Sequence, residues 1–433
     1  MFWAGLRIGR RVRPGAPLWL AVASAALGAA TLGAAPLFWS LAVLTEVYTL
    51  NSLFAATLVL LATHIAWDAG PKERWSPALF GLVLSLGLGN HLTLLAVAAP
   101  LVLWVWSAVG LRRTLNPWAA AALLAGLLVY LYLPLRAAQI PPVNWSDADT
   151  LSGFAWMLTG GPYQEYLLGV PARSIVSRLV PFGELVFSQF NPLGLFFGLV
   201  GARAMITGAP GLLVAMASSL VVLTACALTY NTVDYEVLLV PVFLLFALLV
   251  GVGFLWIAAS WSEGVGQRES FALGTLRFNY HSTCLAAALL AFALVPGVSV
   301  ALNYAAQDLS GNRAAYDHGE ALLKSLPAGG AVVLANSETT AFPLWYMRYV
   351  ERTDLAVVAV PLLQFDWYRR ELRQQFPSLV PEIETLDLDG AIEAIVVNNA
   401  EKGVYFTFNP ASVSESFSAE RQGLVWHVTA PAP

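Results

Sequence analysis

Residues 237–259 read VLLVPVFLLFALLVGVGFLWIAA, 23 consecutive residues without a charged side chain. A helix needs about 20 apolar residues to cross the hydrocarbon core of a bilayer, and it pairs its own backbone polar groups, as lipid requires. This stretch therefore predicts a transmembrane helix. The composition agrees, because 58% of the residues are hydrophobic and only 12% are charged, whereas a typical soluble domain has about 25% charged residues.

Similar windows recur along the chain, so the sequence predicts a polytopic α-helical membrane protein with about nine spans. The predicted spans are 18–36, 49–67, 77–89, 91–109, 117–135, 190–206, 211–229, 237–259 and 283–301. The apolar run 77–109 could also form one helix, but we favour two short helices with Asn90 and His91 at the turn. Residues 18–36 also resemble a signal peptide cleaved near Ala34 or Ala35, but the long apolar stretch favours an uncleaved span.

The positive charges of the short loops predict the orientation, because Lys and Arg are retained in the cytoplasm. They precede the first span, lie between the second and third, and follow the fourth, whereas the loops 37–48 and 230–236 contain none. We therefore expect a protein of the cell inner (plasma) membrane with a cytoplasmic N-terminus. An odd number of spans then places the long loop 136–189 and the C-terminal region on the extracytoplasmic side.

Three regions follow from this topology: a basic N-terminus (1–17), a membrane domain (18–301) with its outer loop 136–189, and an extracytoplasmic domain (302–433). The formal net charge is +3 over residues 1–301 and −7 over the rest. Short apolar runs alternate with helical patterns in the last region, which predicts a small α/β domain. Its predicted helices are 313–326, 338–350 and 365–376, and its predicted strands are 331–335, 355–360, 404–408 and 424–428.

Polar residues near the outer ends of the spans are the candidates for function, because a charge close to hydrocarbon needs a partner or a role. Each one alone is explained more simply as a cap or local pair, for example Glu46 with Arg136, or Asp234 with Glu236 as helix-dipole partners. As a group they predict a substrate site. The candidates are Glu46, Tyr48, Asn90, His91, Arg136, Asn144, Trp145, Asp234 and Glu236.

The outer loop 136–189 is rich in Trp, Tyr, Gly and Pro. Its aromatic side chains could form an interfacial belt at the lipid headgroups, or they could stack on sugar rings, and both interpretations remain open. We expect Asp147 and Asp149 to cap a short helix over residues 150–157. The histidines are scattered without ligand spacing, so no metal is expected. No basic tract beyond the first 17 residues suits nucleic acid, so no nucleic-acid partner is expected.

Several strings resemble the protein O-mannosyltransferase-like membrane family, whose bacterial members were long described only as a domain of unknown function. The resemblance covers roughly residues 18–375. The strings are Phe38-Trp39-Ser40, Thr45-Glu46-Val47-Tyr48-Thr49-Leu50-Asn51, Leu88-Gly89-Asn90-His91-Leu92-Thr93, Tyr132-Leu133-Pro134-Leu135-Arg136, Thr159-Gly160-Gly161-Pro162-Tyr163, residues 230–240 and Asp308-Leu309-Ser310-Gly311.

The resemblance implies a type C glycosyltransferase that moves a sugar from a polyprenyl-phosphate donor to a protein or glycan acceptor at the outer membrane face, without a cofactor. An acidic residue of the first outer loop acts as base in such enzymes, and Arg136 is our candidate for binding the donor phosphate. Family members usually carry an earlier span and an Asp-Ser-Gly-Glu-like outer loop. This chain has neither, so we expect a shortened N-terminus and assign no catalytic base.

Two other functions remain open. The interrupted run 77–109 is typical of the broken helices that line transport paths, which suits a carrier or flippase for a lipid-linked or polar solute. A non-catalytic membrane scaffold, whose outer α/β domain binds a partner, is the third hypothesis. The sequence specifies neither the sugar, nor the acceptor, nor the oligomeric state.

Overall fold

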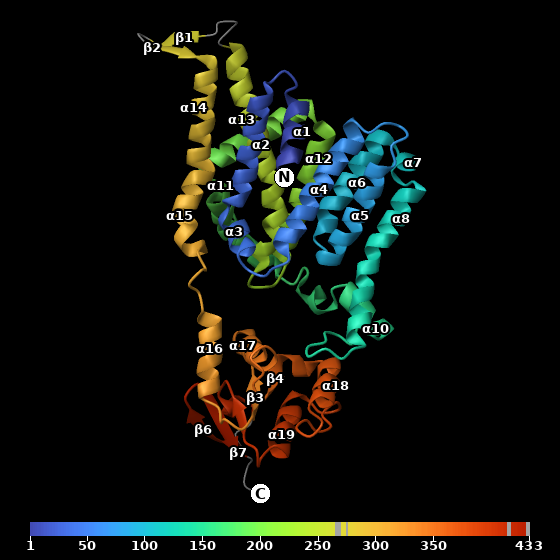
Figure 1. Cartoon of the computed structure of the whole chain (residues 1–433), viewed down its shortest axis with the longest axis vertical. Helices are drawn as coiled ribbons and strands as arrows, with labels where there is room; N and C mark the ends of the chain where they lie inside the picture. The colour runs from blue at the N-terminus through green and yellow to red at the C-terminus, as the bar shows by residue number, and fades with distance from the viewer. Residues whose placement is uncertain (265–269, 274–275, 414–416, 430–433) are drawn as a thin grey trace. The chain divides into compact units, whose positions relative to one another are not determined.

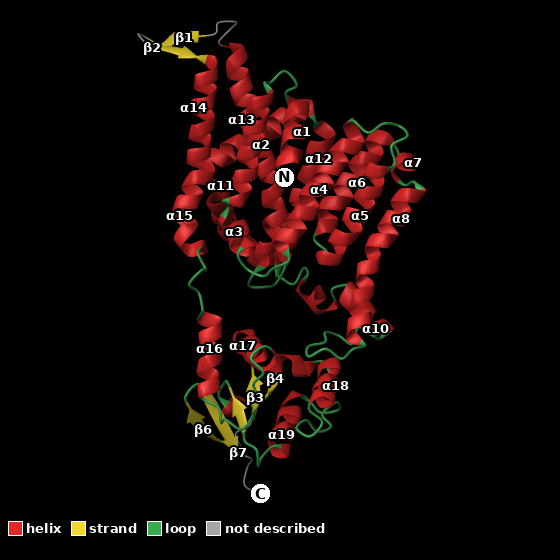
Figure 2. Ribbon diagram, in the orientation of Figure 1, coloured by secondary structure: helices red, strands yellow, loops and turns green. Residues whose placement is uncertain are grey.

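The computed structural model describes residues 1–264, 270–273, 276–413 and 417–429, and Figure 1 traces them along the chain. The chain divides into two compact units, residues 1–130 with 163–309 and residues 131–162 with 310–433. The first unit is almost wholly helical, whereas the second holds a five-stranded sheet with helices around it (Figure 2). The structure thus confirms a mostly helical protein with a small sheet in its C-terminal region.

Nearly all of the predicted apolar spans lie on helices of the first unit. In chain order these are α1 (Phe2–Val12), α2 (Leu18–Gly33), α3 (Pro36–Ala42), α4 (Tyr48–Trp67), α5 (Trp75–Asn90), α6 (Leu94–Val109), α7 (Leu111–Thr114), α8 (Pro117–Leu127), η1 (Leu128–Leu131), η2 (Gly161–Tyr166), α11 (Ala172–Gly208), α12 (Pro210–Thr229), η3 (Tyr235–Leu239), α13 (Val240–Gly264), α14 (Tyr280–Phe292), η4 (Ala293–Gly297) and α15 (Val298–Gln307). Strands β1 (Ser270–Leu273) and β2 (Leu276–Asn279) form an antiparallel pair between α13 and α14.

Fewer helices than expected have the length of a span. Within the described residues, six helices are long and apolar enough to cross a membrane, or seven if the bent pair α2–α3 counts as one span. Helices α5 and α6 are shorter, with 16 residues each. These helices support a multi-pass membrane protein, while the nine spans, their orientation and the inner membrane stay predictions.

The apolar run 77–109 forms two helices, as the sequence predicts. Helix α5 ends at Asn90, His91 takes an extended backbone conformation, and α6 begins at Leu94. Both helices pack on α4. A side chain at Gly87 would collide with Leu94 and Phe54, so the glycine permits this close packing.

Helix α13, which contains the sequence 240–259, is the centre of the first unit. The apolar window of its span is 83% buried, and it packs against α2 and α11. A Cβ atom on Gly28 would lie 2.7 Å from the carbonyl oxygen of Ala247, and one on Gly253 would overlap the carbonyl oxygen of Phe197. Small residues let helix backbones approach in membranes, so these glycines set the spacing of the central helices.

The N-terminal residues are more than a basic tail. Helix α1 is amphipathic and packs on α2, α4 and α13, with Ala4 and Ile8 buried. The arginines Arg10 and Arg11 lie in its last turn, where positive charge suits the helix dipole. Residues 2–12 are therefore part of the helical core.

Three helical segments of the first unit are interrupted. Helices α2 and α3 meet at a 70° bend. Helix α11 is broken at Asn191, whose φ of 47° and ψ of 172° are not helical, and Pro192 follows. The segment η4 between α14 and α15 is a π-helix that contains Pro296, which has no N–H to donate to a preceding carbonyl.

The second unit contains the predicted C-terminal sheet with its helices, and it also includes residues 131–162, which the sequence analysis assigned to the membrane domain. Its sheet has the order β4-β3-β5-β7-β6, in which β3 is parallel to β4 and β5, while β7 is antiparallel to β5 and β6. All predicted helices and strands of this region are present, and α19 and β6 are additional. The elements are α9 (Tyr132–Ala137), α10 (Leu151–Leu158), α16 (Ala314–Lys324), β3 (Ala331–Ala335), α17 (Glu338–Tyr349), β4 (Leu355–Ala359), η5 (Val360–Gln364), α18 (Asp366–Gln375), α19 (Leu388–Asn398), β5 (Val404–Phe406), η6 (Pro410–Ser412), β6 (Ser418–Gln422) and β7 (Val425–Thr429). Residues 414–416 and 430–433 of the predicted domain lie outside the described residues.

The region predicted as the loop 136–189 differs from the expectation in two ways. Helix α11 already begins at Ala172, so residues 172–189 are helical. The helix expected over 150–157 exists as α10, but Thr150 caps it through a 3.0 Å hydrogen bond to the N–H of Gly153. Asp147 does not cap this helix, because its carboxylate pairs with Arg370.

Candidate functional site

A polar cluster surrounds Tyr48 at the start of α4. The carboxylates of Glu46 and Asp234 and the hydroxyls of Tyr163 and Tyr230 lie close enough to its hydroxyl to interact electrostatically. All five residues belong to the first unit. Loops far apart in the sequence therefore bring two acidic side chains and three tyrosines together, and we call these residues the Tyr48 cluster.

The break between α5 and α6 adds two predicted candidates to this cluster. The ring of His91 lies 5.4 Å from the ring of Tyr48. Asn90 donates a 3.0 Å hydrogen bond from Nδ2 to the carbonyl oxygen of Val47. Asn90 thus holds the segment between Glu46 and Tyr48 against the break, which explains why an amide is placed there.

Contacts of Thr93 with Nδ1 fix the orientation of the His91 ring. The backbone N–H of Thr93 donates to Nδ1 of His91 at 3.2 Å, and the Thr93 hydroxyl lies 2.8 Å from the same atom. Asn51 donates from Nδ2 to that hydroxyl at 3.0 Å. Because Nδ1 accepts a backbone N–H, the neutral ring carries its proton on Nε2. His91 can therefore donate a hydrogen bond from Nε2.

Asp234 and Glu236 lie at the start of η3. Asp234 is exposed and occupies the N-cap position, yet its side chain makes no capping hydrogen bond. Glu236 is half-buried in the first turn of η3. Asp234 therefore has an exposed carboxylate beside Tyr48, while Glu236 retains the simpler role of a dipole partner.

Arg178 on α11 is a cation beside this site that the sequence analysis did not find. Its Nη1 donates to the carbonyl oxygen of Tyr230 at 2.7 Å, and its guanidinium lies over the ring of Tyr235, 4.6 Å from the centroid. Burial raises the pKa of Tyr230, and the nearby Tyr163 and Asp234 add to this shift. Arg178 thus anchors the backbone that presents Tyr230 and Asp234. The only signal in the sequence was an arginine in a segment predicted as a loop.

The other three candidates, Arg136, Asn144 and Trp145, belong to the second unit. Arg136 donates from Nη1 to Oε1 of Gln139 at 2.6 Å. The backbone N–H of Asn144 donates to Oε1 of Glu371 at 2.8 Å, and the ring of Trp145 lies 5.6 Å from that of Trp367. These residues are tied to their own unit.

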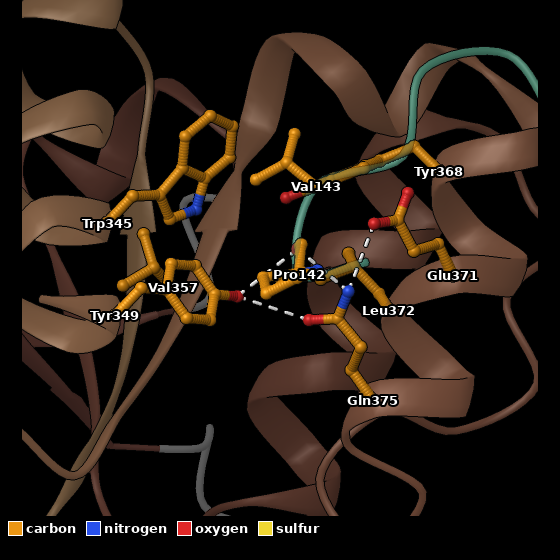
Figure 3. A pocket seen from close by; sticks show the side chains of 9 residues that line it. All are labelled: Pro142, Val143, Trp345, Tyr349, Val357, Tyr368, Glu371, Leu372 and Gln375. Atoms are coloured by element: carbon orange, nitrogen blue, oxygen red, sulfur yellow. Dashed lines mark hydrogen bonds between the residues drawn. The ribbon is translucent and has the colours of Figure 1, made fainter. Parts of the chain in front are cut away.

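A small cavity lies beside the same part of the second unit (Figure 3). Its volume is about 10 Å³, which has room for about one water molecule and none for a sugar. Tyr349, Gln375 and the backbone of Pro142 line it together with the carboxyl group of Glu371. The complete lining is Pro142, Val143, Trp345, Tyr349, Val357, Tyr368, Glu371, Leu372 and Gln375.

The cluster has the chemistry of a site for a polar organic substrate. Among the residues that the structure describes, no group of three or more His, Cys, Asp or Glu side chains is placed to hold a metal ion. Carboxylates accept hydrogen bonds from hydroxyl groups, the His91 ring and tyrosine hydroxyls can donate them, and a carboxylate can act as a general base.

Two family models match separate parts of the chain. The protein O-mannosyl-transferase TMEM260 N-terminal domain matches residues 2–113, and the TMEM260-associated domain 2 matches residues 315–386. Among characterised proteins, the chain is 23% identical to the protein O-mannosyl-transferase tmem260 of Dictyostelium discoideum over 77% of its own length. It is 29% identical to the protein O-mannosyl-transferase TMEM260 of Mus musculus over 30% of its length. These matches support the predicted resemblance to the O-mannosyltransferase-like family.

The chain spans 45% of the length of the Dictyostelium relative and 19% of the length of the mouse relative. No solved structure matches it. The N-terminal match contains Glu46, Tyr48, Asn90 and His91, and the C-terminal match contains α17 and α18. Both units of the structure therefore hold a segment typical of this family.

Proposed function

We propose that the protein is a membrane glycosyltransferase that transfers a sugar from a polyprenyl-phosphate donor to a protein or glycan acceptor on the extracytoplasmic face. The observation that carries this proposal is the Tyr48 cluster, in which the carboxylates of Glu46 and Asp234 lie within electrostatic range of Tyr48 and the ring of His91 lies 5.4 Å from its ring. The family supports sugar transfer as the reaction, because both relatives are named as protein O-mannosyl-transferases.

Each group of the cluster has a role in this proposal. The carboxylates of Glu46 and Asp234 accept hydrogen bonds from the sugar or the acceptor, and one of them removes the proton of the acceptor hydroxyl. His91 donates from Nε2 to a sugar oxygen. Arg178 lies beside the cluster and is the candidate cation there for the donor phosphate, because a guanidinium binds phosphate oxygens through paired hydrogen bonds. Arg136 belongs to the other unit and stays the candidate that the sequence predicts.

The test uses the purified full chain in proteoliposomes with radiolabelled polyprenyl-phosphate mannose and a Ser/Thr-rich acceptor peptide. We expect label in the peptide, and a loss of transfer by a factor of about 10² or more in Asp234→Asn or Glu46→Gln, according to which residue is the base. The exposed Glu401→Gln is the matched control. If both variants transfer sugar at the rate of the unmodified protein, the Tyr48 cluster takes no part in the reaction. If the peptide is labelled only when the donor carries another sugar, the proposed sugar is wrong and the transfer reaction stands.

A carrier or flippase is the second candidate function. The observation in its favour is the set of three interrupted helices, at the α2–α3 bend, at Asn191 and in η4, since broken helices line substrate paths in transporters. The same proteoliposomes separate the two functions. Movement of the labelled lipid between leaflets without label in the peptide would favour the carrier.

A further inference from the structure

One face of α18 holds the segment Pro141–Asp147 of the second unit. The side chains that do so are Trp367, Arg370, Glu371 and Gln375, whose spacing places them along one side of a helix. Their contacts are the ring of Trp145, the carboxylate of Asp147, the N–H of Asn144 at 2.8 Å and the carbonyl oxygen of Pro142 at 2.9 Å, respectively. Tyr349 of α17 adds a hydrogen bond to the same carbonyl at 3.3 Å.

The segment Pro141–Asp147 contains backbone conformations that are unfavourable without supporting contacts. Ser146 and Asp147 have φ values of 74° and 47°, in the left-handed region that residues other than glycine rarely adopt. Ser146 is nevertheless buried. Such conformations persist where surrounding contacts impose them. The shape of Pro141–Asp147 therefore depends on its contacts with α18.

Glu371 is the central contact and the least ordinary one. Its Oε1 accepts hydrogen bonds from the N–H of Asn144 at 2.8 Å and from Nε2 of Gln375 at 3.0 Å. Its Oε2 is buried without a hydrogen-bond partner, and the residue is only 6% exposed beside the one-water cavity (Figure 3). Burying an ionised carboxylate with an unpaired oxygen costs much more free energy than burying the neutral, protonated group.

The charged and titratable groups around Glu371 favour the protonated form. Asp147 repels a negative charge at Glu371, and Tyr349 and Tyr368 offer no positive charge. Arg370 is engaged with Asp147. Burial raises the pKa of Glu371 to about 8, Asp147 adds to the shift, and the hydrogen bonds from Asn144 and Gln375 oppose it.

We propose that Glu371 is the positioning residue of the segment Pro141–Asp147: its neutral carboxyl group holds Asn144 and Trp145 in place, and its ionisation loosens them. The C-terminal unit thereby acts as the support of this segment. The consequence for sugar transfer rests on the proposed function and on the sequence prediction that Asn144 and Trp145 contact the substrate. The contact of the segment Pro141–Asp147 with α18, which we call its docking, does not depend on the proposed function.

The direction of the pH effect follows from the two ionisation constants. Burial in the docked segment raises the pKa of the Glu371 carboxyl group to about 8 from its ordinary 4.5, the value expected once release exposes the group to water. Between these values only the docked form keeps the proton, so docking weakens by up to about tenfold per pH unit as the pH rises through this window. Docking is tightest at the acid end and levels off above about pH 8.

Hydrogen–deuterium exchange of the full chain in lipid nanodiscs tests the proposal. The amide of Asn144 is followed at about pH 6 and pH 8.5, with the intrinsic rate at each pH taken from the denatured chain. We expect its protection to fall at least about tenfold at the higher pH. Glu371→Gln, which keeps the acceptor oxygen without a charge, should retain protection at both pH values. Glu401→Gln should behave as the unmodified protein.

A second variant tests the pH dependence in a different way, and the exchange of the β3 amides shows whether the variant is folded. Asp147→Asn removes the repelling charge, so the pH midpoint of protection should move down, while the amides of β3 stay protected as a check of the fold. Unchanged protection between the two pH values, or the same pH dependence in Glu371→Gln, would overturn the proposal. If the protein transfers sugar, KM for the donor should rise with pH in the unmodified chain and not in Glu371→Gln. If the sugar-transfer assay gives no product, the proposed function fails, but the hydrogen–deuterium exchange still decides the role of Glu371.

Discussion

The side-chain amide of Asn191 donates hydrogen bonds to the carbonyl oxygens of Leu294, at 2.9 Å, and Val295, at 3.3 Å. Two interrupted helices are thereby joined, because Asn191 lies at the break of α11 and both carbonyls belong to the π-helical segment η4. Oδ1 of Asn191 accepts from the N–H groups of Leu193 and Gly194. One side chain thus satisfies backbone groups that the two interruptions release.

Neighbouring bonds connect the third interruption to the same place. Oε1 of Gln189 accepts from the N–H of Leu37 at 2.9 Å, and the hydroxyl of Ser299 donates to the carbonyl oxygen of Ala34 at 2.5 Å. Leu37 and Ala34 flank the α2–α3 bend. Polar side chains therefore compensate for every interruption in this part of the first unit.

Asn191→Leu should lower the stability of the folded chain in detergent or lipid by about 1–2 kcal/mol, because interhelical hydrogen bonds in membranes have this size and no leucine atom replaces them. The midpoint of unfolding in sodium dodecyl sulfate measures the change. Asn191→Asp keeps the acceptor for Leu193 and Gly194 but turns a carboxylate oxygen toward the carbonyl oxygens of Leu294 and Val295, so its loss should be at least as large. Equal midpoints for all three proteins would show that the bonds add no stability.

Gly253→Ala should destabilise the first unit by about 1–3 kcal/mol, as overpacking does in a tight core. The added methyl group would overlap the carbonyl oxygen of Phe197 on α11. Gly33→Ala is the matched control, since nothing lies within 4 Å of its new methyl group and alanine favours a helix by about 1 kcal/mol. The same unfolding assay should show opposite shifts. A neutral Gly253→Ala would mean that α11 and α13 can move apart freely.

Long apolar runs predicted most helices because the lipid requirement leaves few alternatives. The first part of α11 was missed, since Arg173, Arg178 and Glu184 interrupt its apolar pattern and Pro181 suggests a loop. Strands β3 and β4 were found because parallel strands buried on both faces are continuous apolar runs. Strand β6 was missed for the opposite reason. It is an exposed edge strand with the sequence SAERQ, which no core pattern reveals.

The candidate site was predictable only in part. Charge near the ends of apolar spans made Glu46, His91 and Asp234 candidates, because such positions are costly without a role, and the structure places all three near Tyr48. The pairing of residues is a tertiary property, as the ion pair of Asp147 and Arg370 shows with a separation of 223 residues. The sequence likewise placed Asp147 at a helix cap, since a local role was the only one that its neighbours suggested.

Glu73 should make the first unit less stable as the pH falls. The hydroxyl of Ser76 lowers the pKa of Glu73, burial opposes this, and the bond with Nε2 of His64 at 2.8 Å adds to the lowering. A lowered carboxyl pKa stabilises the fold above about pH 4.5, and this contribution is lost as the pH falls through the folded value. Thermal unfolding midpoints between about pH 5 and pH 3 should therefore fall more steeply in the unmodified chain than in Glu73→Gln. Parallel slopes would contradict this.

Thr93→Val should make the ring of His91 more mobile, because the ring loses its contact with the Thr93 hydroxyl. The hydroxyl of Thr93 accepts from Asn51, whose Oδ1 is already buried without a hydrogen-bond partner. Loss of the hydroxyl leaves the Asn51 amide unpaired as well, which costs about 1–3 kcal/mol. Thr57→Val is the matched control, because that exposed hydroxyl bonds only to the carbonyl oxygen of Leu53 in its own helix. If the proposed sugar transfer holds, KM for the donor should rise in Thr93→Val with a smaller effect on kcat, since a mobile His91 binds sugar less well but takes no part in the proton transfer. Identical unfolding midpoints for the two valine variants would exclude this support of His91.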